Sequence, residues 1–341
     1  SDTKGSTNLN IYGFSEDDNS SFTKRINQII GGGFGLSGDQ NDVTIDNDKI
    51  KHRGNVYGNT NLNIYGGNIP TFFAGGYHNG SKDKKGVNYS KDRIYQRQFH
   101  REKVAVVFGD TNVFVGGNAN LYGSEGWYGG SLASTIKGNV NFRIADEAKA
   151  SVSPNAYTPS SMNEFYQDNR GQYDYGGENS IFGAGQFDII EGVVNITVDG
   201  GYIYYLNIMP LVKDMNGKLD GVASTEIRNL KKENAAAKLT INGGMIVDAR
   251  GDYMSLKGFR NEGKSRINGD IDISVHGGQI YYLLGYDGRN DSFVDKYDVN
   301  IDLYDSTVYN VQGISKLDAA NKNGVNANLR YHSKSDTGYI E

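Results

Sequence analysis

The feature of this chain that most limits its fold is a short strand pattern that returns nine times. When the sequence is aligned on four glycine pairs that begin at Gly66, Gly200, Gly243 and Gly277, the residues two, four and six positions earlier are mostly apolar. These columns hold Ile64, Val198, Ile241 and Val275; Leu62, Ile196, Leu239 and Ile273; and Thr60, Val194, Ala237 and Ile271. The intervening residues, such as Asn63 and Thr197, are polar. Because side chains alternate between the two faces of a strand, the pattern predicts strands with one buried and one solvated face.

The same spacing locates five further copies that lack a clean glycine pair. They are Leu9 and Ile11 before Gly13; Val113 and Val115 before Gly116-Gly117, with a one-residue slip; Val140, Phe142 and Ile144; Val299, Ile301 and Leu303; and Ala327, Leu329 and Tyr331. The nine anchors stand at positions 13, 66, 116, 146, 200, 243, 277, 305 and 333. The last two steps, from 277 to 305 and from 305 to 333, are equal and are the shortest. They indicate a bare coil, and the longer steps indicate insertions.

A strand of this kind cannot bury its apolar face alone, so its neighbours in a stack must cover it. The sequence therefore predicts one all-β domain over residues 1–341, a parallel β-helix (β-solenoid) of about nine coils with insertions at 78–103, 118–130, 146–180 and 207–236. A β-propeller blade needs four strands in about 40 to 45 residues, and the bare coil is too short to supply them. A β-sandwich would not keep the same inward columns from coil to coil.

Composition excludes several classes of protein. The chain has no cysteine, so neither disulfides nor thiolate metal sites hold the fold. It has no apolar run long enough to span a membrane. The net charge of −5 gives no nucleic-acid signature. The chain starts at Ser1 without an export signal and so reads as a segment excised from a larger surface protein, with any anchor outside it.

The insertion at 78–103 is the most basic part of the chain. Between Lys82 and Lys103 there are eight basic and three acidic residues, interleaved with aromatic rings. Such a combination can stack on rings and pair with carboxylates, sulfates or phosphates. The candidate ligand-binding residues here are Tyr77, His78, Lys84, Lys85, Arg93, Tyr95 and Arg97. The alternative is a solvated loop whose charge prevents association.

Aromatic residues mark two further candidate sites. Trp127, the only tryptophan, and Tyr128 stand between glycines, where they form either a platform for a ligand or a cap over the solenoid interior. The insertion at 146–180 carries Tyr166, Tyr173 and Tyr175 and is either a recognition loop or a cover for the side of the coils. The tyrosine pairs Tyr204-Tyr205 and Tyr281-Tyr282 lie two coils apart, and we interpret them as aromatic stacking between coils.

No catalytic residue and no cofactor is predicted. Asp199, Asn242 and His276 share a column on the solvent side, and a carboxylate near an imidazole can do acid-base work, but polar residues at strand ends are ordinary turn chemistry. The acid-rich stretches 16–19 and 39–48 lack the spacing of an EF-hand. Calcium is the one metal that the composition leaves open.

The segments Gly58-Asn-Thr-Asn-Leu-Asn-Ile-Tyr-Gly-Gly-Asn-Ile69 and Gly269-Asp-Ile-Asp-Ile-Ser-Val-His-Gly-Gly-Gln-Ile280 resemble the strand repeats of right-handed parallel β-helix domains in bacterial surface adhesins of the pectate-lyase-like class. The resemblance covers nearly the whole chain as a fold-level pattern. It implies an extracellular, cell-wall-anchored, non-enzymatic domain that binds a polysaccharide or glycoprotein on a host or neighbouring cell. The lack of cysteine fits a Gram-positive cell surface.

Two alternatives share the same coil. Polysaccharide lyases and glycoside hydrolases of β-helix fold need clustered Asp residues with Ca²⁺ and a base, or close carboxylates on neighbouring coils, and the aligned columns contain no such cluster. The other alternative is a segment of a phage tail fibre, which would be expected to form a trimer.

Overall fold

The structure is a computed structural model, and it describes residues 2–13, 28–36, 53–79, 101–121, 126–150, 159–169, 180–210, 223–251, 264–286, 297–314 and 326–332. The regular secondary structure of the described residues is almost entirely β-strand, and the strands pair in parallel. They form sheets of nine, eleven, four and two strands. The all-β class with long parallel sheets is confirmed, and the arrangement is consistent with a β-solenoid.

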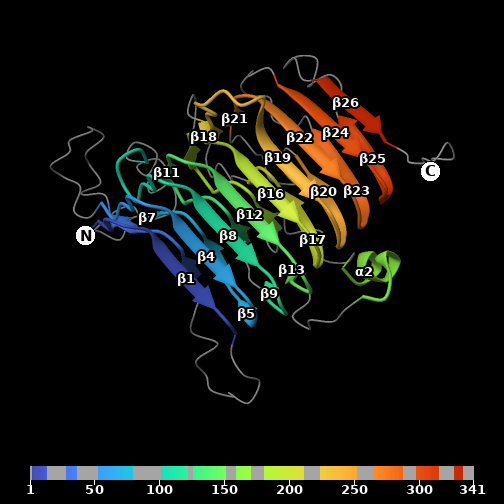
Figure 1. The fold of residues 1–341 in the computed structure, drawn as a ribbon, viewed down its shortest axis with the longest axis horizontal. Coiled ribbons are helices and arrows are strands. Elements are labelled where there is room, and N and C mark those ends of the chain that lie inside the picture. Colours follow the sequence, from blue (N-terminus) through green and yellow to red (C-terminus); the bar gives the residue numbers. More distant parts are fainter. Residues whose placement is uncertain are drawn as a thin grey trace, which may run out of the picture.

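The nine-stranded sheet contains one strand from each predicted copy, in sequence order, as a row of near-parallel arrows in Figure 1. Its strands are β1 (Thr7–Ile11), β4 (Thr60–Ile64), β8 (Thr111–Val115), β12 (Val140–Ile144), β16 (Val194–Val198), β19 (Ala235–Ile241), β22 (Asp270–Val275), β24 (Asp298–Leu303) and β26 (Asn326–Tyr331). The predicted inward residues are buried, as Leu62, Ile196 and Ile273 illustrate at 0 to 1% exposure. The apolar columns of the sequence are therefore the inner face of this sheet.

One detail of the predicted register is wrong. Ile64 pairs with Val115 and Val115 with Ile144, so the strand of the third copy follows the same register as the others. The slip belongs to the glycines that follow the strand, because Gly116 takes the place that Tyr65 holds in the preceding coil. An alignment on the strands is therefore more regular than an alignment on the glycine pairs.

An asparagine ladder runs along the outer face of this sheet. In five consecutive coils the second residue of the strand is Asn, and each side-chain amide donates to Oδ1 of the Asn in the preceding coil at 2.8 to 2.9 Å. The ladder consists of Asn8, Asn61, Asn112, Asn141 and Asn195. Asp272, Asn300 and Asn328 repeat the arrangement near the other end. These bonds fix the register that apolar burial alone would enforce less sharply.

The eleven-stranded sheet forms a second wall, and it is less regular. It contains β2 (Gln28–Ile30), β5 (Asn68–Ile69), β6 (Thr71–Phe73), β9 (Asn120–Leu121), β10 (Trp127–Tyr128), β13 (Lys149–Ala150), β14 (Ser180–Phe182), β17 (Tyr202–Asn207), β20 (Met245–Arg250), β23 (Gln279–Tyr286) and β25 (Thr307–Ile314). In the N-terminal coils the wall consists of two separate rows, which meet at β17. From β17 to β25 it is a single row.

The described residues of the predicted insertion 118–130 contribute strands to the coil. They supply β9 and β10 to the second wall, and the coil that holds them, from Thr111 to Val140, is close in length to the bare coils at the C-terminal end. Trp127 pairs with Phe72 and Ile181 and is fully buried in the main core. Its indole N–H donates to the carbonyl of Pro70 at 3.1 Å. Of the two interpretations of this tryptophan, the structure supports an interior residue.

Two smaller sheets complete the strands. The four-stranded sheet comprises β11 (Thr135–Ile136), β15 (Ile189–Ile190), β18 (Ala223–Ile227) and β21 (Lys264–Ile267), and the two-stranded sheet comprises β3 (Phe34–Leu36) and β7 (Tyr77–Asn79). Ile136, Ile190 and Ile227 turn into the same core as the inner columns of the nine-stranded sheet. The strand β18 lies within the predicted insertion 207–236, so part of that segment also belongs to the coil.

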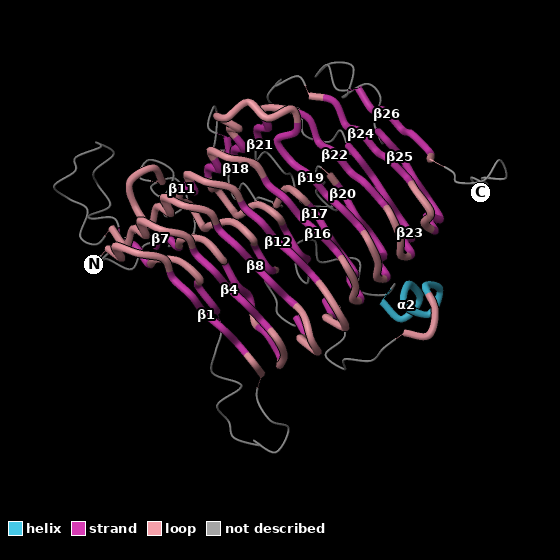
Figure 2. The backbone as a smooth tube through the Cα atoms, viewed as in Figure 1, coloured by secondary structure: helices cyan, strands magenta, loops and turns pink. Residues whose placement is uncertain are grey.

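The described residues contain one α-helix, α2 (Met162–Asn169), which Figure 2 draws in cyan outside the stack, beside the strands of the C-terminal half. It begins with a capping box, because Ser161 Oγ accepts the N–H of Glu164 at 3.2 Å while the Glu164 carboxylate accepts the N–H of Ser160 at 2.7 Å. The bonds from Ser160 lower the pKa of Glu164. Within the predicted insertion 146–180, the described residues therefore include this helix outside the strands, while Lys149 and Ala150 form β13 of the second wall.

Candidate ligand-binding surface

The helix α2 packs on the outer face of the second wall. Met162 and Phe165 are 2% exposed and contact Tyr204 and Val247, which belong to β17 and β20. The ring of Phe165 meets that of Tyr204 edge-on at 6.1 Å. The helix thus covers β17 and β20 on this face and reaches β23, where Tyr166 meets Tyr281.

Four tyrosines, on α2, β23 and β25, lie close together where α2 meets β23. The ring of Tyr166, on α2, stacks on Tyr281 of β23 with centroids 4.1 Å apart and planes 19° from parallel. Tyr281 in turn meets Tyr282 edge-on at 4.7 Å and lies 5.8 Å from Tyr309 of β25. We call these four residues, Tyr166, Tyr281, Tyr282 and Tyr309, the tyrosine strip.

The strip is exposed and has polar neighbours. Tyr282 is 40% and Tyr309 is 47% exposed. In the strand register Tyr282 lies between Asp248, which is 5% exposed, and Asn310, which is exposed. Arg250 holds Asp248 with two bonds of 2.7 and 2.5 Å. The strip therefore combines ring faces with fixed polar groups, which is the composition of many binding surfaces.

Partial burial raises the pKa of Tyr282 above that of a free phenol, and the neighbouring phenols of Tyr166 and Tyr281 raise it further. The hydroxyl of Tyr282 therefore stays protonated through the physiological range and remains a hydrogen-bond donor. For this residue, binding should not depend on pH near neutrality.

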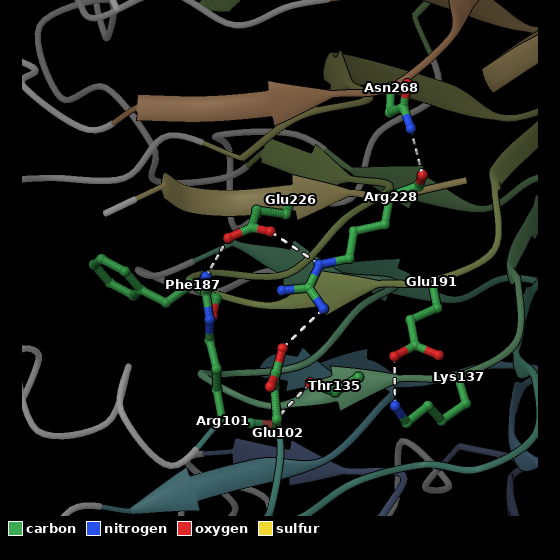
Figure 3. A network of polar contacts seen from close by, with 9 residues as sticks. All are labelled: Arg101, Glu102, Thr135, Lys137, Phe187, Glu191, Glu226, Arg228 and Asn268. Carbon is green, nitrogen blue, oxygen red and sulfur yellow. Dashed lines mark hydrogen bonds and ion pairs between the residues drawn. The ribbon is translucent and has the colours of Figure 1, made fainter. Parts of the chain in front are cut away.

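A network of charged side chains lies at the C-terminal end of the insertion 78–103, next to the four-stranded sheet (Figure 3). Arg101 is 5% exposed, forms an ion pair with Glu226 and donates to the carbonyl of Phe187 at 3.3 Å. Arg228 bridges Glu226 at 3.0 Å and Glu102 at 2.8 Å. Desolvation lowers the pKa of Arg101, and the charge of Glu226 opposes that effect.

Asp188 lies next to this network and is fully buried. One carboxylate oxygen accepts the N–H groups of Ser131 and Gly185 at 3.1 and 2.9 Å, while Oδ1 has no hydrogen-bond partner among the described residues. Burial raises the pKa of Asp188 to about 7, although the two N–H donors and Arg101 act in the opposite direction. The charges around Arg101 satisfy one another, so we regard the network as an anchor that fixes where the insertion returns to the coil.

The predicted site residues fall into four groups. Lys84, Lys85, Arg93, Tyr95, Arg97, Tyr173 and Tyr175 lie outside the described residues. Trp127, Tyr128 and His78 are at most 2% exposed, because they are interior or corner residues, and so they cannot form a surface platform. Tyr77 is half-buried, stacked on Phe34 at 5.6 Å. Of the described candidates, Tyr166 is the one that belongs to the exposed tyrosine strip.

Asp199, Asn242 and His276, which share a column after the strands of the nine-stranded sheet, do not form one hydrogen-bonded group. Asn242 donates to Asp199 at 2.7 Å and Arg143 donates to the other oxygen at 2.6 Å, and these bonds lower the pKa of Asp199. His276 instead stacks on Tyr304 at 4.3 Å. A carboxylate that holds its proton this weakly and is paired with Arg143 is a poor general base, so the column is ordinary turn chemistry.

Sequence reasoning missed two arrangements that the register makes visible. Each tyrosine pair is edge-on within itself, at 4.6 Å for Tyr204 and Tyr205, and Tyr281 contacts both Tyr309 of the next coil and Tyr166 of α2, a contact that the sequence did not indicate. The asparagine ladder could have been found, since the column after each first strand residue reads Asn in the first five coils. The helix itself had a sequence signal in the Ser161 to Glu164 spacing.

The described residues contain no group of three or more His, Asp or Glu side chains placed to hold a metal ion, and the acid-rich stretches 16–19 and 39–48 lie outside them. Within the same residues, no helix is long and apolar enough to cross a bilayer. No protein-family model matches the chain, and comparison with curated proteins and with solved structures gave no match.

Proposed function

We propose that this chain is a right-handed parallel β-helix of the adhesive class, an extracellular, non-enzymatic domain on the surface of a Gram-positive bacterium that binds a glycan. The observation that carries the proposal is the tyrosine strip. Four phenol rings are held by a capped helix and two strands, and two of them remain 40% or more exposed. Large rings kept at the surface in a fixed arrangement are typical of recognition surfaces.

A carbohydrate fits this surface by chemistry. A sugar ring offers C–H groups that pack on the face of an aromatic ring, and hydroxyls that exchange hydrogen bonds with phenols, carboxylates and amides. Tyr282 and Tyr309 supply the ring faces, and Asp248 and Asn310 flank Tyr282 in the register. Because Arg250 and the strand fix Asp248, little conformational entropy is lost when a ligand binds.

The basic insertion is the second contact in this proposal. Its return to the coil is fixed by the buried pair of Arg101 and Glu226. Lys84, Lys85, Arg93 and Arg97 would pair with carboxylates or sulfates of an anionic polymer, and Tyr95 would stack beside them. The ligand is then a polysaccharide or glycoprotein on a host or neighbouring cell.

The strip is tested by a glycan array with the whole chain, followed by calorimetric titration of the best ligand. Tyr282→Ala and Tyr309→Ala should each weaken binding at least about tenfold, which corresponds to about 1.4 kcal/mol. Tyr282→Phe should lose less, since it keeps the ring. Tyr57→Ala is the matched control, because Tyr57 is 43% exposed and stacks on Phe108 in the N-terminal coils. Unchanged affinity in both alanine variants would refute the strip as the binding surface.

The contribution of the basic insertion to binding can be measured separately from that of the tyrosine strip. A variant with Lys84, Lys85, Arg93 and Arg97 changed to Ala should lose binding to pectin, heparin or mucin, most strongly at low salt. Lys231 and Lys232 changed to Ala remove two positive charges elsewhere and serve as the control. Equal binding by the first variant would restrict the ligand to the tyrosine strip.

Turnover distinguishes this proposal from the enzyme alternative. The protein should leave anionic polysaccharides intact in the presence and in the absence of Ca²⁺. Appearance of unsaturated products or new reducing ends would instead assign the chain to the lyases or hydrolases of the same fold.

A further inference from the structure

The two ends of the nine-stranded sheet each present an unpaired strand edge. Within the described residues β1 pairs only with β4, and β26 pairs only with β24. Leu9 and Leu329, which belong to the central inward column, are 37% and 46% exposed, whereas Leu62 and Ile301 in the adjacent coils are 0% exposed. Among the described residues, the apolar core is therefore open at both ends of the stack.

The partly buried members of the core occupy these same ends. Ile11 and Ile29 lie in the first coil, and Val308, Val311, Ile314 and Ala327 lie in the last two strands. The interior coils between them bury their inward residues, as Phe142 and Leu239 show at 0 to 1% exposure. One further coil on either end would complete the burial.

The two open edges match one another in register. If β1 of a second copy continues the alignment that joins β24 to β26, Leu9 falls beside Leu329, and Asn8 falls beside Asn328. Leucine would meet leucine on the inner face, and asparagine would meet asparagine on the outer face. The spacing that joins neighbouring coils within the chain would then join two chains.

The hydrogen-bonding groups that remain at the edges are also complementary. Asn8 uses its side-chain oxygen to accept from Asn61, and Asn328 uses its amide to donate to Asn300. The groups left over are the amide of Asn8 and the oxygen of Asn328, a donor and an acceptor. Every bond of the ladder runs from a later coil to an earlier one, and this bond would have the same direction.

The aromatic residues that follow the two end strands also match in this register. Tyr12 stacks on Tyr65 at 5.2 Å and is 75% exposed, while His332 stacks on Tyr304 at 4.5 Å. In the continued register Tyr12 of the second copy lies against His332. Each end thus carries a ring whose outer face is open to a partner ring.

The end strands lack the charges that usually protect edges from pairing. β1 reads Thr-Asn-Leu-Asn-Ile and has no charged residue. The single charge of β26 is Arg330, and Asp302 of the adjacent strand already pairs with it at 2.6 Å. We propose that copies of this chain associate head to tail, with β26 of one copy pairing in parallel with β1 of the next.

A contact of this kind joins two different surfaces, so it does not close on itself and allows chains of more than two copies. In sedimentation equilibrium of the whole protein, the weight-average mass should rise with concentration beyond that of a dimer. Leu9→Lys and Leu329→Lys should each weaken self-association at least about tenfold. Leu230→Lys is the control, because Leu230 is 59% exposed and lies away from both ends.

Mixing the two variants separates this contact from a folding defect. The Leu9→Lys protein keeps an intact β26, and the Leu329→Lys protein keeps an intact β1, so an equimolar mixture should form dimers although neither protein associates alone. Tyr12→Ala, which changes a ring outside the core, should weaken association without lowering the melting temperature. A wild-type protein that stays monomeric at all concentrations, single variants that still form dimers, or a mixture that stays monomeric would each overturn the proposal.

Discussion

The two walls of this molecule are built from the same coils but differ in regularity. The nine-stranded sheet repeats one pattern from β1 to β26, with the same inward columns throughout and an asparagine ladder over its first five strands. The eleven-stranded sheet is split into two rows in its N-terminal half and carries α2 and the tyrosine strip in its C-terminal half. One wall therefore holds the register, and the other is free to vary in length, ring content and insertions.

The largest expected effect on stability comes from a core residue of the irregular, eleven-stranded wall. Trp127→Ala should lower the free energy of unfolding by about 3–5 kcal/mol, because it removes a fully buried ring. Ile196→Ala in the regular wall should cost about 2–5 kcal/mol. Urea unfolding measures both. A much smaller loss for Trp127→Ala would mean that the irregular wall is loosely packed.

The same tryptophan gives an optical check that needs no variant. As the only tryptophan, Trp127 should emit at the blue end of the indole range and resist quenching by iodide. A red-shifted, readily quenched emission would place it at the surface and restore it as a candidate binding residue.

The next largest effect concerns Asp188, which lies between β14 of the eleven-stranded sheet and β15 of the four-stranded sheet. Its pKa is about 7 in the folded protein, against 3.8 for an ordinary carboxyl. Between these values the folded state binds more protons than the unfolded state, so the contribution of Asp188 to stability falls as pH rises from about 4 to 7 and levels off above that. The upper limit of the loss is about 4 kcal/mol.

Asp188→Asn isolates that contribution. The amide keeps an oxygen for the N–H groups of Ser131 and Gly185 but does not ionise. The wild type should lose stability relative to the variant as pH rises from 5 to 8. Parallel stability curves for the two proteins over that range would show that Asp188 does not titrate there.

A smaller effect tests the register function of the regular wall. Asn141→Ala removes two ladder bonds, to Asn112 and from Asn195, and should cost about 1–2 kcal/mol. Thr197→Ala changes an outward residue of a neighbouring strand that is not part of the ladder, and should cost less than about 0.5 kcal/mol. Equal losses in thermal or urea unfolding would indicate that the ladder does not stabilise the wall.

The smallest effect lies at the C-terminal edge. Arg330 and His332 bond Asp302 at 2.6 and 2.8 Å, and the Arg330 bond is the main reason that the pKa of Asp302 falls to about 2. Because its partners are exposed, a double-mutant cycle of Asp302→Asn and Arg330→Gln should give a small coupling free energy that shrinks with salt. The contribution is present above about pH 4 and is lost as pH falls through about 2. A coupling that is independent of salt would contradict this account.

The regular wall was predictable from the sequence, and the irregular wall was not. Period-two columns such as Leu62, Ile196 and Ile273 reveal a repeated strand whichever residues lie between copies. The short strands β9 and β10 contribute only two residues each, too few for any periodicity, so Trp127 could be read as surface or interior. Only its pairing with Phe72 and Ile181 decides the matter.

The tyrosine strip shows the same limit for function. Tyr281 and Tyr282 were visible as a repeated pair, but the partner ring of Tyr281 comes from residue 166, more than a hundred positions earlier. Contacts between an insertion and a coil depend on how the insertion folds back, and no column in the alignment encodes that. The charged network shows this too, since Arg101 meets Glu226 across 125 positions.

The equal steps from Asp272 to Asn300 and from Asn300 to Asn328 make each coil at the C-terminal end an interchangeable unit of length. Adding one copy of residues 271–298 would repeat the register of β22 and β24 and lengthen the molecule by about 4.8 Å. Removing one would shorten it by the same amount and would leave the packing of Tyr204 under α2, but it would also delete rings of the tyrosine strip, which lie on β23 and β25. The length of the stack can thus change in increments of one strand spacing.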